Sequence, residues 1–428
     1  MKKYLLIIFL LTLICNTAVG YSEDKLDCPS SVLVDAHSGK ILFSNHSDEI
    51  RFPASLTKVM TAILALEMGD FSDILTVDDS TPYTIDGSHI ALEPGEQINF
   101  VHMLNALLIA SANDVAEVIA INYEGSVESF VDKMNEKAVE LGMSQTHFTN
   151  PHGLHDENHY STAEDMAKLA VYAYKNETIR EIIEKPNYTI PPTNIKNEER
   201  YLNNSNRLLS GVGYGNQIII DGYYVDIKYE GATGFKTGYT PEAGSCLIGS
   251  AKKDDLELIS VVLGGYITEV YSDTVKLFNY GFDHFENVQL VESGMFYKNA
   301  RLDNLVLEEV PLITSRSLSA VIPIEMKASI YEVVDYYDYD IPLSKDERIA
   351  FVSYYIDNEL LGSVDLISPI QVNAIGMPNE SDWDRLVPII KQIVFLISII
   401  ILLVFLLRVY NILRIQRIRR KRKKKTGL

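Results

Sequence analysis

The predominantly apolar run from Val387 to Leu407 constrains this chain more than any other feature of its sequence. As a helix, its 21 residues would be about 31 Å long, enough to cross the hydrocarbon core of a bilayer. Lys391 and Gln392, near its start, could extend toward the membrane interface. From Ile393 onward the run is apolar on all sides apart from one serine. It therefore favours a transmembrane helix over an amphipathic helix that lies in the membrane plane.

The two ends of the chain indicate the same orientation in a membrane. Residues 408–428 contain ten Lys or Arg and no acidic residue, so the positive-inside rule predicts a cytoplasmic tail and an extracytoplasmic body. At the N-terminus, two lysines precede an apolar run and a small-x-small site ahead of Tyr21, the pattern of a secretory signal peptide. We expect residues 1–20 to be this signal and the rest to be anchored in the cell membrane.

The charge of the exported body excludes one class of function. The net charge of the chain is −20, but without the ten tail charges and the two N-terminal lysines, 26 basic residues face 58 acidic ones. A body this acidic does not bind nucleic acid by electrostatics. Cys28 and Cys246 could form a disulfide outside the cell, although two cysteines do not make a disulfide framework.

Strand patterns lie at both ends of the first 280 residues, and helical patterns lie between them. Residues 31–43 predict two short strands around a turn, residues 209–231 predict a hairpin, and three further strands follow up to residue 265. Four segments have helical periodicity: residues 55–69, 101–122, 130–141 and 162–175. This order predicts an α+β domain over residues 21–280, with one sheet in which the N- and C-terminal strands meet.

The pattern of apolar and polar residues changes near Gly281. Residues 281–375 alternate apolar and polar side chains, which predicts a small all-β domain without a convincing catalytic cluster. We expect residues 376–386 to link this domain to the transmembrane helix at residues 387–407.

Ser55 and Lys58 stand three positions apart where a helical pattern begins, in the segment PASLTKVMTA. A serine hydroxyl is a weak nucleophile at neutral pH and needs a base beside it. Residues i and i+3 share a helix face, so Lys58 can reach the Ser55 oxygen, and the helix N-terminus would favour a developing oxyanion. The spacing alone is weak, because Ser55 could be a simple helix N-cap and because Ser250 and Lys253 repeat it at the end of a predicted strand.

A second polar group, Ser111-Ala112-Asn113, interrupts the apolar helical run of residues 101–122. One interpretation is a helix break or a pair of buried polar caps. The functional interpretation is that a second hydroxyl and an amide face Ser55 and Lys58.

A third group, Lys236-Thr237-Gly238, lies in a predicted strand. Lys236 could be an ordinary surface lysine. Alternatively, it supplies a cation for a substrate carboxylate, Thr237 adds a hydroxyl, and Gly238 lets the ligand lie against the strand backbone. A second Lys-Thr-Gly at residues 425–427 lies in the predicted cytoplasmic tail, on the wrong side of the membrane for this role.

These motifs occur in an exported protein in the order known for penicillin-binding proteins and class A β-lactamases. With the blocks LEPGEQINFVHMLNALLIASANDVAEVIA and GFKTGYTPEAGSCLIGSA, the chain resembles the low-molecular-mass penicillin-binding proteins that are serine-type D-alanyl-D-alanine carboxypeptidases. The resemblance covers residues 31–265. It implies a β-lactamase/transpeptidase-like catalytic domain with a central antiparallel sheet. Such a domain removes the terminal D-Ala of peptidoglycan stem peptides and binds β-lactam antibiotics covalently.

The resemblance also implies a role for each residue of the first two motifs. Ser55 would form the acyl-enzyme, and Lys58 would be its general base. Ser111 would relay a proton to the leaving group, and Asn113 would order that network.

The third motif would bind the substrate. Lys236 and Thr237 would hold its carboxylate, and the charge of Lys236 would help to keep the general base neutral. Gly238 would complete the strand that the substrate lies against. The backbone N–H groups of Ser55 and Tyr239 would form the oxyanion hole. Neither a metal nor a cofactor is implied.

The chain departs from the family pattern in two places. The middle motif has Ala112 where the motif usually has Asp. In addition, 21 residues separate the blocks NSNRLL and GATGFKTG, a longer segment than the family usually has. An enlarged loop there could change substrate access, and it leaves the placement of Arg207 beside the carboxylate site open.

Three rival interpretations lead to other functions. His152, His155 and His159 could form a zinc site, but Pro151 and Gly153 favour a loop over the helix that such a site would need. A β-lactamase would share all three motifs and would need a group that activates water, for which Glu164 is the nearest acidic candidate. The third alternative is a scaffold protein that binds the cell wall, which would keep the pocket but would have lost catalytic turnover.

Overall fold

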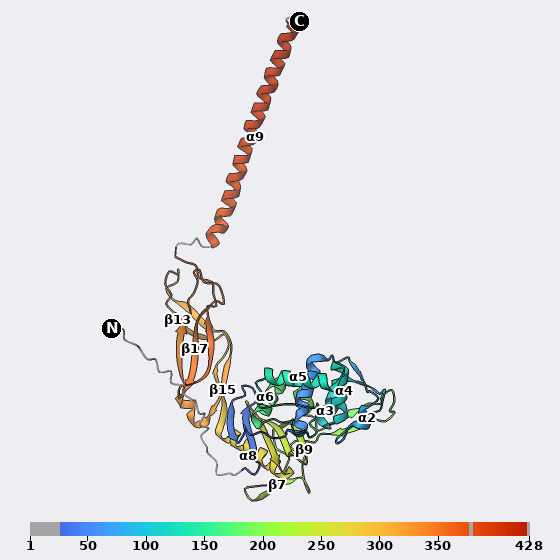
Figure 1. Cartoon of the computed structure of the whole chain (residues 1–428). Helices are drawn as coiled ribbons and strands as arrows, with labels where there is room; N and C mark the ends of the chain where they lie inside the picture. The colour runs from blue at the N-terminus through green and yellow to red at the C-terminus, as the bar shows by residue number, and fades with distance from the viewer. Residues whose placement is uncertain (1–25, 376–379, 426–428) are drawn as a thin grey trace, which may run out of the picture. The chain divides into compact units, whose positions relative to one another are not determined.

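The computed structural model describes residues 26–375 and 380–425, without the side chains of 380–385 and 421–425 (Figure 1). The expected signal peptide and the start of the expected linker lie outside these residues. The chain divides into two compact units. Unit 1 runs to residue 288 and includes residues 321–328, and unit 2 contains residues 289–320 and everything from 329 onward.

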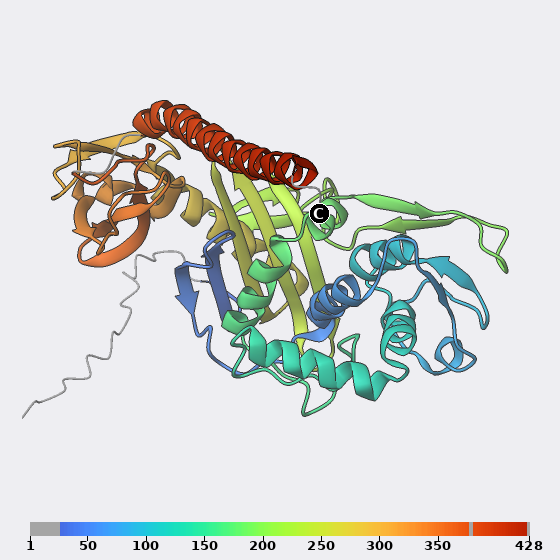
Figure 2. The same cartoon turned by 90° about the horizontal axis from the view of Figure 1, so that it is seen from above.

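Unit 1 is built on one five-stranded antiparallel sheet with the order β2-β1-β11-β10-β9, whose strands lie side by side in Figure 2. The strands are β1 (Ser30–Asp35), β2 (Ile41–Asn45), β9 (Ala232–Thr240), β10 (Gly244–Lys253) and β11 (Leu256–Gly265). The first strand pairs with the last, in a register that places Val32 opposite Val261. The sequence prediction that the N- and C-terminal strands meet in an α+β domain is therefore confirmed.

Helices cover both faces of this sheet because its strands are apolar on both sides. In β11, Ile259 and Val261 belong to one core with the helices between β2 and β9, whereas Leu258 and Val262 belong to a second core with α8 (Ile267–His284). The helices of unit 1 before β9 are η1 (Ala54–Thr57), α1 (Lys58–Met68), α2 (Thr81–Thr84), α3 (Phe100–Ile109), α4 (Asn113–Glu124), α5 (Val127–Glu140), α6 (Ala163–Tyr174) and α7 (Glu177–Ile183).

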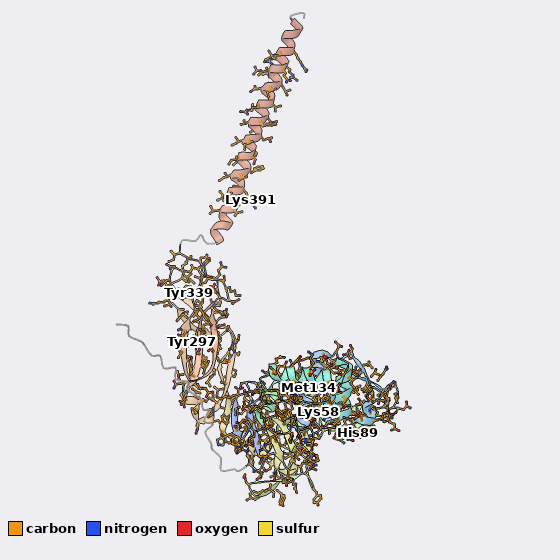
Figure 3. All side chains as sticks on the ribbon, in the orientation of Figure 1. Lys58, His89, Met134, Tyr297, Tyr339 and Lys391 are labelled. Carbon is orange, nitrogen blue, oxygen red and sulfur yellow. The ribbon has the colours of Figure 1, made fainter. Side chains whose placement is uncertain are left out.

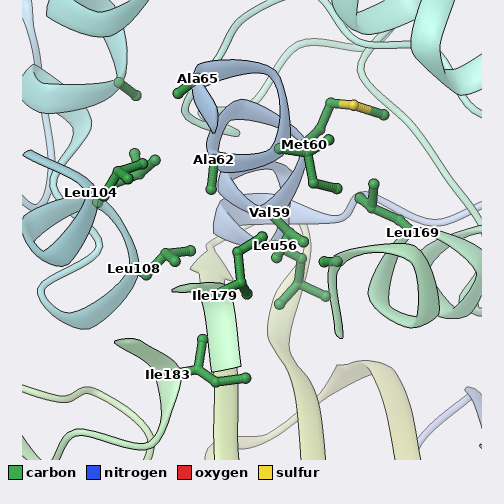
Figure 4. Packing of buried hydrophobic residues seen from close by; sticks show 14 of the residues in the cluster. Leu56, Val59, Met60, Ala62, Ala65, Leu104, Leu108, Leu169, Ile179 and Ile183 are labelled. Carbon is green, nitrogen blue, oxygen red and sulfur yellow. The ribbon is translucent and has the colours of Figure 1, made fainter. Parts of the chain in front are cut away.

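Helix α1 lies at the centre of the first core. Its first eight residues, from Lys58 to Ala65, are all buried, as expected for a helix surrounded by other elements. Figure 4 shows side chains of η1 and α1 next to leucines of α3 and α6 and next to Ile179 and Ile183 of α7. The helix start that carries Ser55 and Lys58 is therefore fixed from several sides.

The structure differs from the predicted helices in several places, including the short helices α2 and α7, which were not predicted. The apolar run at residues 101–122 forms two helices, because Ser111 adopts a left-handed backbone conformation with φ of 58° that a helix cannot continue through. Helix α5 begins at Val127, three residues before the predicted start, with Ser126 as its N-cap. The 18-residue helix α8 was not predicted, although one side of it is buried against the sheet.

Unit 1 also contains three two-stranded sheets: β3 (Ile74–Thr76) with β4 (Gln97–Asn99), β5 (Asn187–Ile190) with β6 (Arg200–Asn203), and β7 (Gln217–Ile220) with β8 (Tyr223–Asp226). The β7–β8 pair confirms the predicted hairpin in the enlarged loop. Asp221 and Gly222 both have positive φ, as a tight two-residue hairpin turn requires.

Unit 2 contains a second antiparallel sheet with the order β13-β14-β18-β17-β16. Its strands are β13 (Phe296–Ala300), β14 (Val310–Thr314), β16 (Tyr331–Tyr336), β17 (Arg348–Ile356) and β18 (Glu359–Ile367). A separate ribbon pairs β12 (Phe285–Val291) with β15 (Leu318–Pro323), and the short helix η2 (Ile324–Ser329) follows β15; the residues of these three elements are divided between units 1 and 2. The expected all-β segment that follows the α+β domain is thus present.

The last helix, α9 (Glu380–Lys425), extends beyond the predicted transmembrane run at both ends. Within the described residues it is the one helix long and apolar enough to cross a membrane, over its segment Leu386–Arg420. The side chains of this segment are not buried in the protein. Length, composition and exposure all fit a membrane anchor.

The loop after α5 presses against the start of α1 at a single glycine. Gly153 has φ of +85°, and a Cβ atom on it would lie 1.9 Å from the carbonyl oxygen of Ala54 and 2.9 Å from Thr57 Oγ1. Only a residue without a side chain allows this approach.

We predict that Gly153→Ala destabilises unit 1 far more than the backbone angle alone explains. A left-handed alanine costs about 1–2 kcal/mol, whereas the clash with the Ala54 carbonyl should bring the total loss in unfolding free energy to about 4 kcal/mol or more. The control is Gly142→Ala, because Gly142 also has a positive φ of +70° but has no atom within 4 Å of its added Cβ. Urea unfolding of the full chain in detergent measures both, and equal losses for the two variants would contradict the prediction.

Candidate active site

Ser55 and Lys58 meet at the junction of η1 and α1. Ser55 lies in the 3-10 turn, Lys58 is the first residue of α1, and Lys58 Nζ lies 3.0 Å from Ser55 Oγ. Ser55 is partly exposed, whereas Lys58 is fully buried; Figure 3 labels Lys58 among the side chains of unit 1. The expected pair of a hydroxyl and an amine is therefore in contact.

Two further oxygen atoms surround the Lys58 amine. Asn113 Oδ1 lies 2.5 Å from Nζ, and the backbone carbonyl oxygen of His152 lies 2.6 Å from it. The orientation of the Asn113 amide is fixed, because its Nδ2 donates to the carbonyl oxygen of Asp86 at 2.6 Å. Burial and, to a smaller extent, the positive charge of Lys236 hold the pKa of Lys58 well below its usual value.

Lys236 and Ser111 form a second contact between an amine and a hydroxyl. Lys236 Nζ lies 2.9 Å from Ser111 Oγ and donates to the Thr237 carbonyl oxygen at 2.7 Å. Lys236 is fully buried, and burial lowers its pKa to about 7. The pKa of Lys58 responds to Lys236 because a charge on the second lysine opposes a charge on the first.

The strand β9 brings the third motif against the serine turn. A Cβ atom on Gly238 would lie 3.1 Å from both the Pro53 carbonyl oxygen and the Ser55 backbone nitrogen, so glycine allows this close approach. Thr237 Oγ1 lies 2.6 Å from Ser205 Oγ. The Tyr239 side chain is exposed, and its backbone follows Gly238 at the end of the strand.

These residues surround an open cleft of about 1230 Å³ in unit 1. Ser55, Ser111, Thr237, Gly238 and Tyr239 line it. Lys58, Asn113 and Lys236 are buried, and the two lysine amines contact the lining residues Ser55 and Ser111. All eight residues that the sequence indicated therefore belong to one site. Arg207 also lines the cleft, and its guanidinium donates to the Gly215 carbonyl oxygen at 3.3 Å, so the enlarged loop leaves it at the site.

Each of the three motifs has a strained backbone at its key position. Ala54, just before Ser55, has φ of 49°, Ser111 has φ of 58°, and Phe235, just before Lys236, has φ of 123°. Non-glycine residues adopt such angles at a cost of about 1–3 kcal/mol each, and they persist where the surrounding structure fixes them. Strain of this kind is concentrated at functional sites.

The three histidines of the loop do not form a metal site. In the described part of the chain, no group of three or more His, Cys, Asp or Glu side chains is arranged to hold a metal ion. His152 and His159 are buried with hydrogen-bond partners inside the protein, and the ring of His155 packs edge-on against Phe52. Each of the three rings is therefore in contact with other groups of the protein.

Other candidates from the sequence lie outside the chemistry of the cleft. Glu164 lies in the first turn of α6, pairs with Lys168 at 3.4 Å and does not line the cleft, so it is not placed to activate water there. Cys28 and Cys246 are both free and buried. Ser250, in the second Ser-x-x-Lys, contacts Thr233 Oγ1 at 2.7 Å, while Lys253 is exposed.

Two members of the site were missed in the sequence. The carbonyl oxygen of His152 is a backbone atom that any residue could supply, so no residue pattern indicates it. Ser205 contacts Thr237 from the NSNRLL block. Arg207, two positions further along the chain, was a candidate for the carboxylate site. This closeness in sequence was the only signal that could have indicated Ser205.

Comparisons with known proteins agree with this geometry. A family model described as D-alanyl-D-alanine carboxypeptidase, peptidase S11, matches residues 17–266, and one described as the C-terminal domain of penicillin-binding protein 5 matches residues 285–374. D-alanyl-D-alanine carboxypeptidase DacF of Bacillus subtilis is 34% identical over 303 residues, which cover 70% of this chain and 73% of DacF. DacA of Haemophilus influenzae is 29% identical over 389 residues, 87% of this chain and 92% of DacA.

The fold is shared with a solved relative over most of the chain. Penicillin-binding protein 5 from Haemophilus influenzae superimposes with a TM-score of 0.67 at 27% sequence identity, over 83% of this chain and all of that one. The peptidase S11 match alone spans more than half of the chain and contains every residue of the cleft motifs. The chain therefore belongs to the D-alanyl-D-alanine carboxypeptidase family of low-molecular-mass penicillin-binding proteins.

Proposed function

We propose that this protein is an exported, membrane-anchored serine carboxypeptidase that removes the terminal D-Ala from peptidoglycan stem pentapeptides through an acyl-enzyme on Ser55. The observation that carries the proposal is the contact between Ser55 Oγ and the amine of Lys58, which is buried and has a lowered pKa. A second contact between a lysine and a serine, Lys236 with Ser111, lies at the same cleft. The family membership supports the reaction type.

The contacts of Lys58 explain how it would act as a base. A neutral amine has two N–H donors and one lone pair. Asn113 Oδ1 and the His152 carbonyl oxygen can only accept, so they take both hydrogens. The lone pair then faces Ser55 Oγ, whose proton it receives as the serine oxygen attacks the carbonyl carbon between the two D-Ala residues.

Ser111 is placed for the second half of acylation. When the tetrahedral intermediate collapses, the C–N bond breaks and the leaving D-Ala amine needs a proton. Ser111, which lines the cleft and contacts Lys236, can deliver its hydroxyl proton to this amine and take up in exchange the proton that Lys58 received from Ser55, so that Lys58 is neutral again. Water then attacks the Ser55 ester, with Lys58 again as the base, and releases the shortened peptide.

The residues of β9 that line or adjoin the cleft would bind the substrate. The Lys236 ammonium and the Thr237 hydroxyl would hold the terminal carboxylate. The N–H groups of Ser55, near the start of a 3-10 helix, and of Tyr239 would stabilise the oxyanion. A β-lactam presents a carboxylate and a reactive carbonyl to the same groups, so it would acylate Ser55 and leave slowly.

The C-terminal helix and the basic tail after it indicate where the enzyme would be located in the cell. Helix α9 would anchor it in the cell membrane, the basic tail after residue 407 would be cytoplasmic, and the cleft would face the cell wall. The stem peptides of peptidoglycan would be the partners of the cleft.

We predict that benzylpenicillin forms a long-lived covalent adduct on Ser55, and that Ser55→Ala abolishes both this adduct and the release of free D-Ala from a pentapeptide. The loss of turnover should be on the order of 10³-fold or more, because the nucleophile is absent. Intact-mass and peptide-mapping mass spectrometry locate the adduct, and an enzymatic D-Ala assay measures turnover.

Ser250→Ala is the matched control, because it alters the second Ser-x-x-Lys and should leave the adduct and turnover unchanged. An adduct elsewhere than on Ser55 would contradict the proposal. Rapid hydrolysis of penicillin would favour a β-lactamase, and a stable adduct without D-Ala release would favour a scaffold.

We predict a bell-shaped pH profile for the rate at which penicillin acylates Ser55. The rate rises with pH as Lys58, whose pKa is lowered, becomes neutral, and it falls again above a pH of about 7 as Lys236 loses the proton that binds the carboxylate. Carboxylate binding favours the charged form of Lys236 and moves the falling limb of the profile to higher pH once the ligand is bound.

Two variants of Lys236 separate the limbs of this profile. Lys236→Arg keeps the charge at all pH values, so the falling limb should disappear while the rising limb stays in place. Lys236→Gln removes the repulsion on Lys58, so the rising limb should move to higher pH, but only partly, because burial is the larger cause of the low pKa of Lys58. Stopped-flow acylation with a chromogenic β-lactam measures both, and a falling limb retained in Lys236→Arg would contradict the assignment.

A further inference from the structure

The turn that presents Ser55 begins at a strained residue that needs an external restraint. Ala54 has φ of 49° and is buried. A non-glycine residue keeps such an angle only where its surroundings fix it. The Ala54 carbonyl oxygen accepts a hydrogen bond from Thr57 Oγ1 at 2.8 Å, and Gly153 packs directly against the same oxygen.

The Thr57 hydroxyl has a second partner on a distant loop. His159 Nε2 lies 2.8 Å from Thr57 Oγ1, although the two residues are 102 positions apart in the chain. Both side chains are buried.

The hydrogen bonds determine which ring nitrogen of His159 carries the proton. The backbone N–H of Thr149 points to His159 Nδ1 at 3.1 Å, and a backbone N–H can only donate. Nδ1 is therefore the acceptor, Nε2 carries the hydrogen and donates it to Thr57 Oγ1, and Thr57 directs its own hydrogen to the Ala54 carbonyl. Burial lowers the pKa of His159 to about 3, which keeps the ring in this neutral form at neutral pH.

We propose that His159 is a positioning residue for Ser55: by donating to Thr57, it holds the Thr57 hydroxyl on the Ala54 carbonyl and fixes the turn that places Ser55 Oγ on Lys58. The proposal rests on the proposed function, because it concerns the acylation of Ser55. It assigns the loop a role in catalysis beyond the carbonyl that His152 offers to Lys58.

The arrangement makes a specific demand on residue 159. A hydrogen-bond donor must lie at the position of Nε2, on the Thr57 side, and an acceptor must lie at the position of Nδ1, on the Thr149 side. Glutamine places its amide nitrogen near the position of Nε2, whereas the shorter asparagine reaches only the position of Nδ1. The pair His159→Gln and His159→Asn therefore separates the bond to Thr57 from the bond that holds the loop.

The experiment measures penicillin acylation of the full chain in detergent, with the first-order acylation rate separated from the dissociation constant of the non-covalent complex. We expect His159→Gln to acylate within about threefold of the original rate. We expect His159→Asn to acylate about 10- to 100-fold more slowly with an unchanged dissociation constant, since a displaced nucleophile slows chemistry rather than binding.

Variants at Thr57 test the other end of the contact. Thr57→Val removes the hydroxyl at nearly constant shape and should slow acylation as His159→Asn does, and the double variant should be no slower than either single variant. Thr57→Ser keeps the hydroxyl and should retain most of the rate. These variants keep the proposal testable if His159→Asn fails to fold.

His102→Phe is the control for the loss of a hydrogen-bonded histidine elsewhere in unit 1, because His102 Nδ1 contacts the Tyr188 hydroxyl at 2.7 Å and does not line the cleft. It should leave the acylation rate of the folded protein unchanged. A folded His159→Asn that acylates at the original rate, or an equal loss in His159→Gln, would overturn the proposal. Failure of the unaltered protein to acylate at all would instead overturn the proposed function.

Discussion

Two lysine side chains buried side by side without a carboxylate partner are the constraint on which the site depends. Within the described residues, Lys58 and Lys236 contact only neutral oxygen atoms: two hydroxyls, one side-chain amide and two backbone carbonyls. Burial of two uncompensated charges would be very costly, so at least one amine must be neutral. The fold thus holds the pKa of Lys58 well below its usual value, because no carboxylate contacts its amine, and this is what its proposed role as a base requires.

The fold meets this constraint by building the cleft from two kinds of element. The helical side supplies Lys58 and the oxygen atoms around its amine from η1, α1, the α3–α4 break and the loop that contains His152. The sheet side supplies the second amine from β9, the edge strand. Gly238 lets that strand reach the serine turn. Within the described residues β9 pairs with another strand on one side only, so under the proposed function an extended substrate would lie along its other side in the manner of an added strand.

The sequence predicted most of this arrangement because the catalytic side chains belong to short motifs on regular elements. Ser55, Lys58, Lys236 and the meeting of β1 with β11 follow from periodicity and order along the chain. The groups that hold these motif residues in place could not be predicted from the sequence, since they are brought together only by tertiary contacts. The carbonyl of His152 is independent of residue type, the Thr57–His159 contact joins residues 102 positions apart, and no local pattern indicates a left-handed Ala54.

The two Ser-x-x-Lys sequences show why a motif has chemical meaning only on the right element. Ser55 and Lys58 span a helical turn, so their side chains share a face and meet at 3.0 Å. Ser250 and Lys253 have the same spacing in β10, where residues three apart point to opposite faces of the sheet. Ser250 is buried against Thr233, and the Lys253 amine lies over the Phe282 ring. The same residue types at the same spacing thus give a lysine amine in contact with a serine hydroxyl in one place and an ordinary strand end in the other.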